Sequence, residues 1–236
     1  MAPGRADEPP AARAGTPADR GGAEDRAMAD DWAQAVGDWL ADQLTAAGGP
    51  VWLRLAAGLR QLGALDRAVY EAVASVQTPA LDVPVRRLSR AANYSRLWLA
   101  IAAGLAITGG PRGRRAAARG LAAIGVSSAV VNLGLKSVYV RRRPDRASAG
   151  VPGARQVSMP SSASFPSGHS ASAFAFAAAA GRELPWLALG LYFLAAGVAY
   201  SRVHTGVHYP GDTVVGALIG AGTGQTVAGI WDRHAR

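Results

Sequence analysis

The sequence predicts an all-α fold, a multi-pass membrane helix bundle of about five spanning helices with amphipathic helices at the membrane interface. Apolar residues make up 50% of the 236 residues and charged residues 17%, below the roughly 25% of an average soluble domain. Long uncharged segments alternate with short charged ones in the second half of the chain. The basic residues are concentrated in this same apolar part, as expected for a protein that meets anionic lipid or phosphate.

Composition also excludes several kinds of site. The chain has no cysteine, which rules out disulfides, thiolate metal sites, iron–sulfur clusters and cysteine nucleophiles. Residues 1–48 hold 4 Arg against 9 Asp and Glu, a net charge of −5, whereas residues 49–236 hold 21 Lys and Arg against 7 acidic residues, a net charge of +14. Because the basic part is also the apolar part, we expect membrane lipids as partners and no nucleic acid.

The first 64 residues divide into two parts. Residues 1–28 consist largely of Ala, Pro, Gly, Arg, Asp and Glu, which predicts a disordered tail. Residues 29–64 alternate apolar and charged groups at helical spacing, with Trp32 and Trp39 near one face. This pattern predicts amphipathic helices at a membrane surface or, alternatively, a small soluble helical domain. We assign residues 65–236 to a membrane-embedded domain.

Five apolar segments without Asp, Glu, Lys or Arg lie in this domain. A membrane span takes about 20 helical residues, and these segments of 14 to 19 residues reach that length if their ends extend into the loops. Gly216, Gly220 and Gly224 recur at four-residue spacing in the last one, which permits close helix packing in lipid. The alternative is a soluble bundle of buried Ala-rich helices. The segments are 97–110, 120–135, 167–181, 184–201 and 213–231.

Ionisable residues gather at particular ends of these segments, and three of the four histidines are among them. If the chain crosses the membrane at each segment, up-and-down threading puts all of these ends on one side. Ionisable groups at such positions indicate a functional site. They are Lys136 and residues 141–143 after the second segment, His169 at the start of the third, Arg202, His204 and His208 after the fourth, and Asp212 before the fifth.

The spacing of these residues indicates a phosphate site. Lys136 is the single lysine among 25 basic residues, which points to a need for a compact ammonium group. Arg143 can add a guanidinium that grips two phosphate oxygens. Ser167, Gly168 and His169 follow a proline at a helix start, where free backbone N–H groups and the helix dipole attract an anion.

His208 and Asp212 indicate a nucleophile. Pro210 and Gly211 predict a turn between them. A carboxylate beside an imidazole fixes its tautomer and raises its basicity, which suits nucleophilic attack. A competing interpretation for residues 141–143 is that they only bind anionic headgroups.

Three motifs in order resemble those of the type 2 phosphatidic acid phosphatase family, the lipid phosphate phosphatases, which are related to bacterial acid phosphatases and vanadium haloperoxidases. The motifs are Lys-x6-Arg-Pro at residues 136–144, Pro-Ser-Gly-His at 166–169 and Ser-Arg-x5-His-x3-Asp at 201–212. Every defining position is present, and the resemblance covers roughly residues 65–231.

The resemblance implies a metal-independent hydrolase of lipid phosphomonoesters or pyrophosphates that works through a phosphohistidine, with no cofactor. His208 would attack phosphorus, Asp212 would orient and activate His208, and His169 would protonate the leaving alkoxide and later activate water. The groups that would hold the phosphoryl oxygens are Lys136, Arg143, Ser167, Gly168 and Arg202, with Arg141 as a further candidate.

The substrates implied are a polyprenyl phosphate or pyrophosphate, phosphatidate, phosphatidylglycerophosphate or a phosphorylated decaprenyl-sugar precursor, and the sequence does not choose among them. The alternative is a non-catalytic membrane protein that binds phospholipid in the same anion pocket. The pairing of His208 with Asp212 argues against this alternative, because binding alone needs no nucleophile. The oligomeric state is left open.

Charge and composition also give a localisation. Abundant Arg, Ala and Gly predict a bacterial protein from a GC-rich genome. We expect it in the cell membrane, with the site on the extracytoplasmic face, because short loops rich in Lys and Arg tend to be cytoplasmic. The side opposite the site carries Arg112, Arg114, Arg115, Arg182, Arg233 and Arg236.

Other polar residues receive minor roles. We expect His204 in a loop or at the rim of the site, and His234 exposed to solvent. Tyr139 is expected to pack rather than react. Residues 93–95, Asn-Tyr-Ser, are candidates to shape the entrance for a substrate headgroup.

Overall fold

The computed structural model describes residue 38 and residues 51–234. The chain divides into two compact units, Met1–Gly63 and Ala64–Arg236, and this boundary falls inside helix α2 (Val51–Ser75). The predicted tail over 1–28 and most of the predicted interfacial helices over 29–64 lie outside the described residues. Every regular element within the described part of the chain is a helix, which confirms the predicted all-α class.

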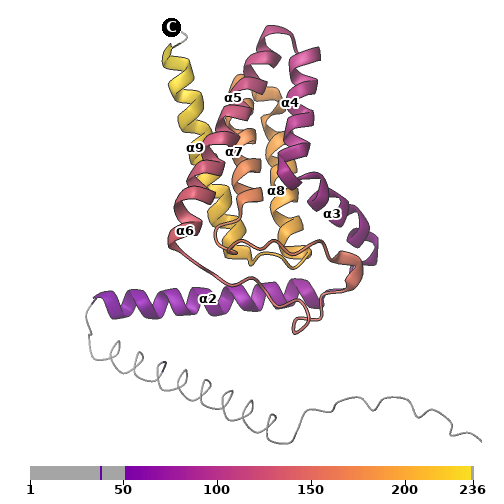
Figure 1. The fold of residues 1–236 in the computed structure, drawn as a ribbon, viewed down its shortest axis with the longest axis vertical. Coiled ribbons are helices and arrows are strands. Elements are labelled where there is room, and N and C mark those ends of the chain that lie inside the picture. The colour runs from indigo at the N-terminus through magenta and orange to yellow at the C-terminus, as the bar shows by residue number, and fades with distance from the viewer. Residues whose placement is uncertain (1–37, 39–50, 235–236) are drawn as a thin grey trace, which may run out of the picture. The chain divides into compact units, whose positions relative to one another are not determined.

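Five helices of the second unit run alongside one another and correspond to the five predicted segments (Figure 1). Three of them, Gly110–Val138, α8 and α9, are long and apolar enough to cross a membrane. The other two, α4 and α7, have 13 and 16 residues and fall short of the roughly 20 that a span needs. The bounds are α4 (Arg96–Thr108), α5 (Gly110–Ala129), α7 (Gly168–Glu183), α8 (Pro185–His204) and α9 (Pro210–His234).

The second of these helices differs from the prediction at both ends. It begins at Gly110 rather than at residue 120, because two of the arginines that predicted a loop there, Arg115 and Arg119, have acidic partners. Buried Arg119 lies 3.2 Å from Glu183 on α7 and 2.7 Å from Asp232 on α9. At its other end α5 continues through a π-helical turn, η2 (Val130–Leu135), into the short α6 (Lys136–Val138).

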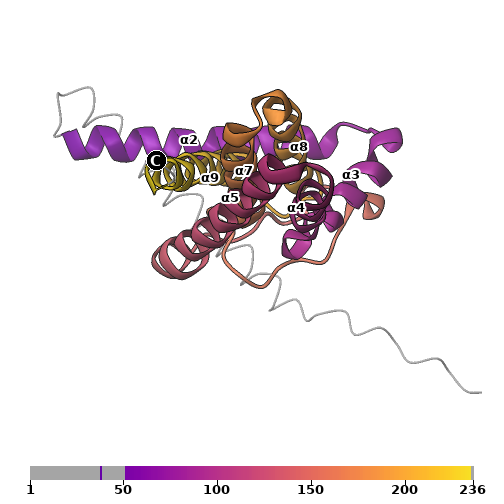
Figure 2. The same ribbon diagram turned by 90° about the horizontal axis from the view of Figure 1, so that it is seen from above.

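Helix α7 lies at the centre of the bundle and packs against α5, α8 and α9 (Figure 2). Its small side chains allow close approach, and most of its residues from Ser170 to Gly181 are buried. On α9, a Cβ atom at Gly216, Gly220 or Gly224 would collide with a backbone carbonyl at residue 167, 171 or 175 respectively. The predicted close packing at this glycine stripe is therefore confirmed.

Helix α3 (Pro79–Ala91) and the 3₁₀ turn η1 (Asn93–Ser95) lead into α4, and α3 packs against α8. Arg155, in the long loop between α6 and α7, is 1% exposed. Its guanidinium donates to the carbonyl of Val73 at 3.2 Å and to Asp82 of α3 at 2.8 Å. The loop is thereby fixed to the C-terminal end of α2 and to α3, at the end of the bundle that holds the predicted site.

Candidate active site

The motif residues meet at one end of the bundle, as the threading predicts. The backbone N–H of Ser167, before α7, donates to the carbonyl of Asp212 in the first turn of α9 at 2.9 Å. Lys136 lies in the last turn of the helix that begins at Gly110, and its Nζ lies 3.8 Å from the place where a Cβ of Gly168 would be. Three segments far apart in the sequence therefore share this end.

His208 is held by a contact at each ring nitrogen and is 1% exposed. Its Nδ1 lies 3.5 Å from Asp212 Oδ2 and 3.5 Å from Ser164 Oγ, whereas Nε2 lies 3.2 Å from Nη1 of Arg143. A proton on Nδ1 is favoured by the carboxylate, which leaves the Nε2 lone pair facing the cationic groups. Nε2 is thus the nitrogen placed to attack an electrophile.

Burial and the positive charges of Arg143 and Arg202 together lower the pKa of His208 to about 4, although the hydrogen bond with Asp212 acts in the opposite direction. An ordinary histidine has a pKa near 6.5. At neutral pH the ring of His208 is therefore uncharged, which is the state that a nucleophile requires.

Asp212 is fully buried and its two oxygens have separate partners. Oδ2 accepts from the hydroxyl of Ser164 and from the backbone N–H of Tyr209, the latter at 2.9 Å. Oδ1 accepts from Nη1 of Arg141 at 2.8 Å. A buried carboxylate with this many donors stays ionised and keeps its orientation.

The guanidinium of Arg141 forms ion pairs with two carboxylates. Besides Asp212, it binds Asp66 of α2 at 2.8 Å, and its guanidinium lies 4.2 Å from the ring centre of Tyr209. Asp66 also accepts the backbone N–H of Gly211 at 2.6 Å. This arrangement favours a role for Arg141 in holding Asp212 over the predicted role in binding phosphate.

Arg143 joins two loops at the site. It donates to the carbonyls of Ser162 at 2.9 Å, Val207 at 2.7 Å and Ala163 at 3.2 Å. The guanidinium of Arg143 is therefore held by backbone carbonyls, and its Nη1 is the atom next to His208. Such anchoring fixes one guanidinium N–H group beside Nε2 of His208.

Arg202 is the most deeply buried cation of the site, at 1% exposed. Its Nη1 donates to Ser89 Oγ of α3 at 2.7 Å. Its Nε is also buried and has no hydrogen-bond partner among the described residues. A buried unpaired donor on a cation favours an anionic ligand.

His169 and Ser167 occupy the start of α7. The Oγ of Ser167 is the N-cap group, accepting from the N–H of Ser170 at 3.4 Å and from the hydroxyl of Ser170 at 3.0 Å. His169 Nε2 lies 2.9 Å from Asn93 Oδ1. Its ring is within electrostatic range of other site members, namely His208, Lys136, Arg143 and Arg202.

His204 differs from the prediction of a loop or rim position. It is the last residue of α8, 2% exposed, and its Nε2 lies 3.2 Å from Asp82 Oδ1. The reason is that Asp82, already bound to Arg155, gives the ring a buried polar partner. His234 is exposed, as predicted, and Tyr139 packs edge-on against Phe165 with ring centres 5.2 Å apart.

Four supporting residues were not predicted as partners of the motif residues: Asp66, Ser89, Ser164 and, in its contact with His169, Asn93. Asp66, Ser89 and Ser164 are single polar residues without motif spacing, so the sequence carries no signal for them, and Asn93 was expected only to shape the substrate entrance. Across the described residues, no three His, Asp or Glu side chains gather in an arrangement that could hold a metal ion.

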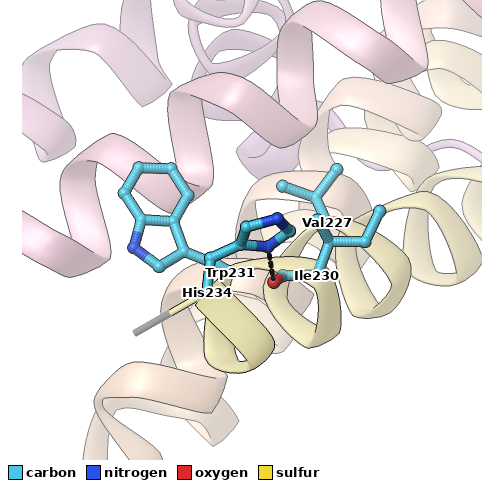
Figure 3. Close-up of a pocket in the computed structure, with 4 residues that line it drawn as sticks. All are labelled: Val227, Ile230, Trp231 and His234. Carbon is cyan, nitrogen blue, oxygen red and sulfur yellow. Dashed lines mark hydrogen bonds between the residues drawn. The ribbon is translucent and has the colours of Figure 1, made fainter. Parts of the chain in front are cut away.

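A cavity of about 310 Å³ lies elsewhere, along the C-terminal part of α9. Val227, Ile230, Trp231 and His234 line it, and His234 contacts the carbonyl of Ile230 (Figure 3). Val227 is 15 residues beyond Asp212 on the same helix, roughly 22 Å along its axis. This cavity is therefore separate from the candidate active site.

Comparisons with known proteins agree with the geometry. Residues 117–235 match the model of the PAP2 superfamily. The decaprenylphosphoryl-5-phosphoribose phosphatase of Mycobacterium tuberculosis is 36% identical over 168 residues, which cover 69% of this chain and 89% of that protein.

Two solved structures share the fold. The transmembrane PAP2-type phosphatidylglycerolphosphate phosphatase of Bacillus subtilis aligns with a TM-score of 0.57 at 23% identity, over 84% of this chain and 96% of its own. LpxE of Aquifex aeolicus aligns with a TM-score of 0.55 at 25% identity, over 69% of this chain and 94% of its own. The predicted membrane-bundle architecture is confirmed by this likeness.

Proposed function

This chain belongs to the PAP2 superfamily and is a membrane lipid phosphatase, and from that premise we propose that His208 is its nucleophile and that its substrate is a polyprenyl-linked sugar phosphate. One observation carries the choice of nucleophile. Nε2 of His208 faces Arg143 at 3.2 Å while Nδ1 faces Asp212. The basic nitrogen thus lies beside the group that would hold the phosphate.

In the first step, Nε2 of His208 attacks phosphorus in line with the ester oxygen. The P–O bond to the lipid breaks. Burial and the nearby cations lower the pKa of His169 in the free protein, and the charge of the bound phosphate dianion acts in the opposite direction, so that His169 takes up a proton in the complex and gives it to the leaving alkoxide. The products are a lipid alcohol and phosphorylated His208, whose Nδ1 proton is held by Asp212. His169 is left neutral.

In the second step, water attacks the phosphohistidine. His169 accepts a proton from the water, the N–P bond breaks, and the electron pair returns to Nε2. Inorganic phosphate leaves and both histidines regain their starting states. The enzyme thus needs no external acid or base.

The cationic groups supply the electrostatic stabilisation. We assign Lys136, Arg143 and Arg202 to the phosphoryl oxygens, together with the N-terminal end of α7 at Ser167 and Gly168. Phosphoryl transfer depends mainly on such positioning and charge. Reaction without a metal ion is part of this proposal.

The relative from Mycobacterium tuberculosis supports the choice of substrate, because its name specifies a decaprenyl chain, a sugar and a phosphomonoester on that sugar. The shared chemistry is a terminal phosphate on a polar headgroup attached to a long lipid. We therefore place this substrate ahead of phosphatidate, phosphatidylglycerophosphate and polyprenyl pyrophosphate.

A substrate panel tests the proposal. Purified protein in detergent is given each of these lipids with EDTA present, and released phosphate is measured. We expect the highest kcat/KM for the polyprenyl sugar phosphate and a loss of at least about 10,000-fold in His208→Ala. Activity that requires Mg²⁺, or that survives in His208→Ala, would contradict the mechanism, and lipid binding without turnover would indicate a binding protein.

We also propose that the site faces the extracytoplasmic side of the cell membrane. Arg112, Arg114, Arg115, Arg182 and Arg233 support this, because they lie at the opposite helix ends, where positive charge favours the cytoplasm. A reporter fused after residue 236 tests the orientation. The C-terminus is expected inside the cell, and a reporter active outside would reverse the assignment.

A further inference from the structure

His169 has a partner outside the three motifs. Its Nε2 lies 2.9 Å from Oδ1 of Asn93, and an amide oxygen can only accept a hydrogen bond. Nε2–H of His169 is therefore the donor in this pair. The other nitrogen, Nδ1, is left to exchange a proton.

We propose that Asn93 is the positioning residue for His169, holding its Nε2–H so that Nδ1 transfers the proton to the leaving group and accepts one from water. This inference rests on the proposed function, since it assigns a partner to the residue that acts there as acid and base. Asn93 itself does not touch the reacting atoms. It acts through the ring that it orients.

The backbone directly after Asn93 has an uncommon conformation. Tyr94 and Ser95, which follow it directly, both have left-handed conformations, with φ of 55° and 57°. Such a conformation is sterically unfavourable for a residue other than glycine. The side chain of Tyr94 is 84% exposed, so its packing does not account for the cost. The turn does place Asn93 between α3 and the start of α4, against α7.

The preceding helix serves the same end of the bundle. Ser89 of α3, four residues before Asn93, accepts from Arg202 at 2.7 Å, and Asp82 contacts His204 at 3.2 Å. The stretch 82–93 thus supplies partners to three residues of the site end, although it lies outside the matched region 117–235. A contact between Asn93 and His169 fits this pattern of support.

A neutral amide suits the position chemically. A carboxylate there would also accept from Nε2–H, but it would add a negative charge close to a phosphate dianion. Asn93 fixes the ring without that repulsion. The arrangement parallels the general way in which a second group sets the tautomer of a catalytic histidine.

Leaving-group dependence tests the proposal. A short-chain alkyl phosphate needs a proton on its leaving oxygen, whereas 4-nitrophenyl phosphate does not. We expect Asn93→Ala to lower kcat/KM for the alkyl ester about 10- to 100-fold and for the aryl ester less than about threefold. His169→Ala should show the same contrast with a larger loss for the alkyl ester.

Two further variants sharpen the test. Asn93→Asp keeps the acceptor, so it should recover part of the activity toward the alkyl ester and move the alkaline limb of the pH profile upward, because the carboxylate favours protonated His169. Gln77→Ala removes an exposed amide before α3 and should leave both substrates unaffected. Thermal unfolding in detergent shows whether each variant is folded.

The outcomes separate the two proposals. Equal losses for both esters in folded Asn93→Ala, or no loss for either, would overturn the positioning role while His208→Ala still abolishes activity. If instead His208→Ala retains activity, the proposed phosphohistidine mechanism itself fails.

Discussion

At the scale of the residue, burial and charge determine the proton affinity of His208, the proposed nucleophile. The pKa of His208 is lowered to about 4 by burial and by Arg143 and Arg202, so its neutral form persists well below the ordinary value near 6.5. We expect the acidic limb of kcat/KM to lie near pH 4. The pH profile is measured with two phosphate esters whose second pKa values differ. A limb caused by ionisation of the substrate shifts from one ester to the other, whereas a limb caused by His208 stays at the same pH. A fixed limb at pH 6.5 or above would contradict the assignment.

A second prediction concerns how Asp212 is held. Asp66 binds Arg141 at 2.8 Å, and Arg141 binds Asp212 at 2.8 Å. We expect Asp66→Asn to lower kcat about tenfold, equivalent to about 1.4 kcal/mol, with little change in KM, since no phosphate contact is lost.

Arg202→Lys is the comparison for this variant. Arg202 is assigned to the phosphate, so its replacement should raise KM as well as lower kcat. Equal effects of Asp66→Asn and Arg202→Lys on KM would show that Asp66 does more than hold Arg141.

At the scale of the element, α7 and α9 are in contact through backbone. A Cβ at Gly220 would collide with the carbonyl of Ala171, whereas one at Gly222 would meet nothing within 4 Å. We expect Gly220→Ala to destabilise the protein by roughly 1–3 kcal/mol and Gly222→Ala to be neutral or slightly stabilising. Thermal unfolding in detergent compares the two, and equal midpoints would disprove the close contact.

The sequence predicts the helices better than it predicts their ends. All five uncharged segments are helices, because uncharged apolar stretches of that length have few other stable forms. The start of α5 is predicted ten residues late, since charge alone does not reveal that Arg119 meets Glu183 and Asp232. Those partners are 64 and 113 residues away in sequence, and only folding brings them together.

The sequence likewise predicts the motif residues of the site but not the residues that contact and hold them. The motif residues were identified by spacing, and the structure brings them to one end of the bundle. Asp66 and Ser89 could not be identified, because each is one polar residue whose partner is distant, as for Asp66 and Gly211, 145 residues apart. Their roles depend on packing that no local pattern records.

At the scale of the whole molecule, the two ends of the bundle carry different charge networks. Away from the site, Arg115 and Arg119 share Glu183, while Arg119 and Arg182 share Asp232. These pairs join α5, α7 and α9. α7 has 16 residues, which separates this network from the site by roughly 24 Å.

We therefore expect Glu183→Gln to affect stability and leave catalysis unchanged. It removes one of two carboxylates from buried Arg119, which should lower the free energy of unfolding by about 1–3 kcal/mol. kcat and KM measured below the unfolding transition should match those of the unchanged protein. A large fall in kcat at unchanged stability would mean that the two ends are coupled.

The glycine stripe on α9 has a consequence for how a lipid reaches the reactive histidine. With carbonyls of one helix against bare Cα atoms of the other, no hydrocarbon chain fits between α7 and α9. The seam is closed to a lipid tail, so under the proposed function the tail of the substrate lies along another flank of the bundle. The same seam joins the first turn of α7, which carries His169, to the first turn of α9, which carries Asp212, so the close backbone contact fixes the spacing of these two groups.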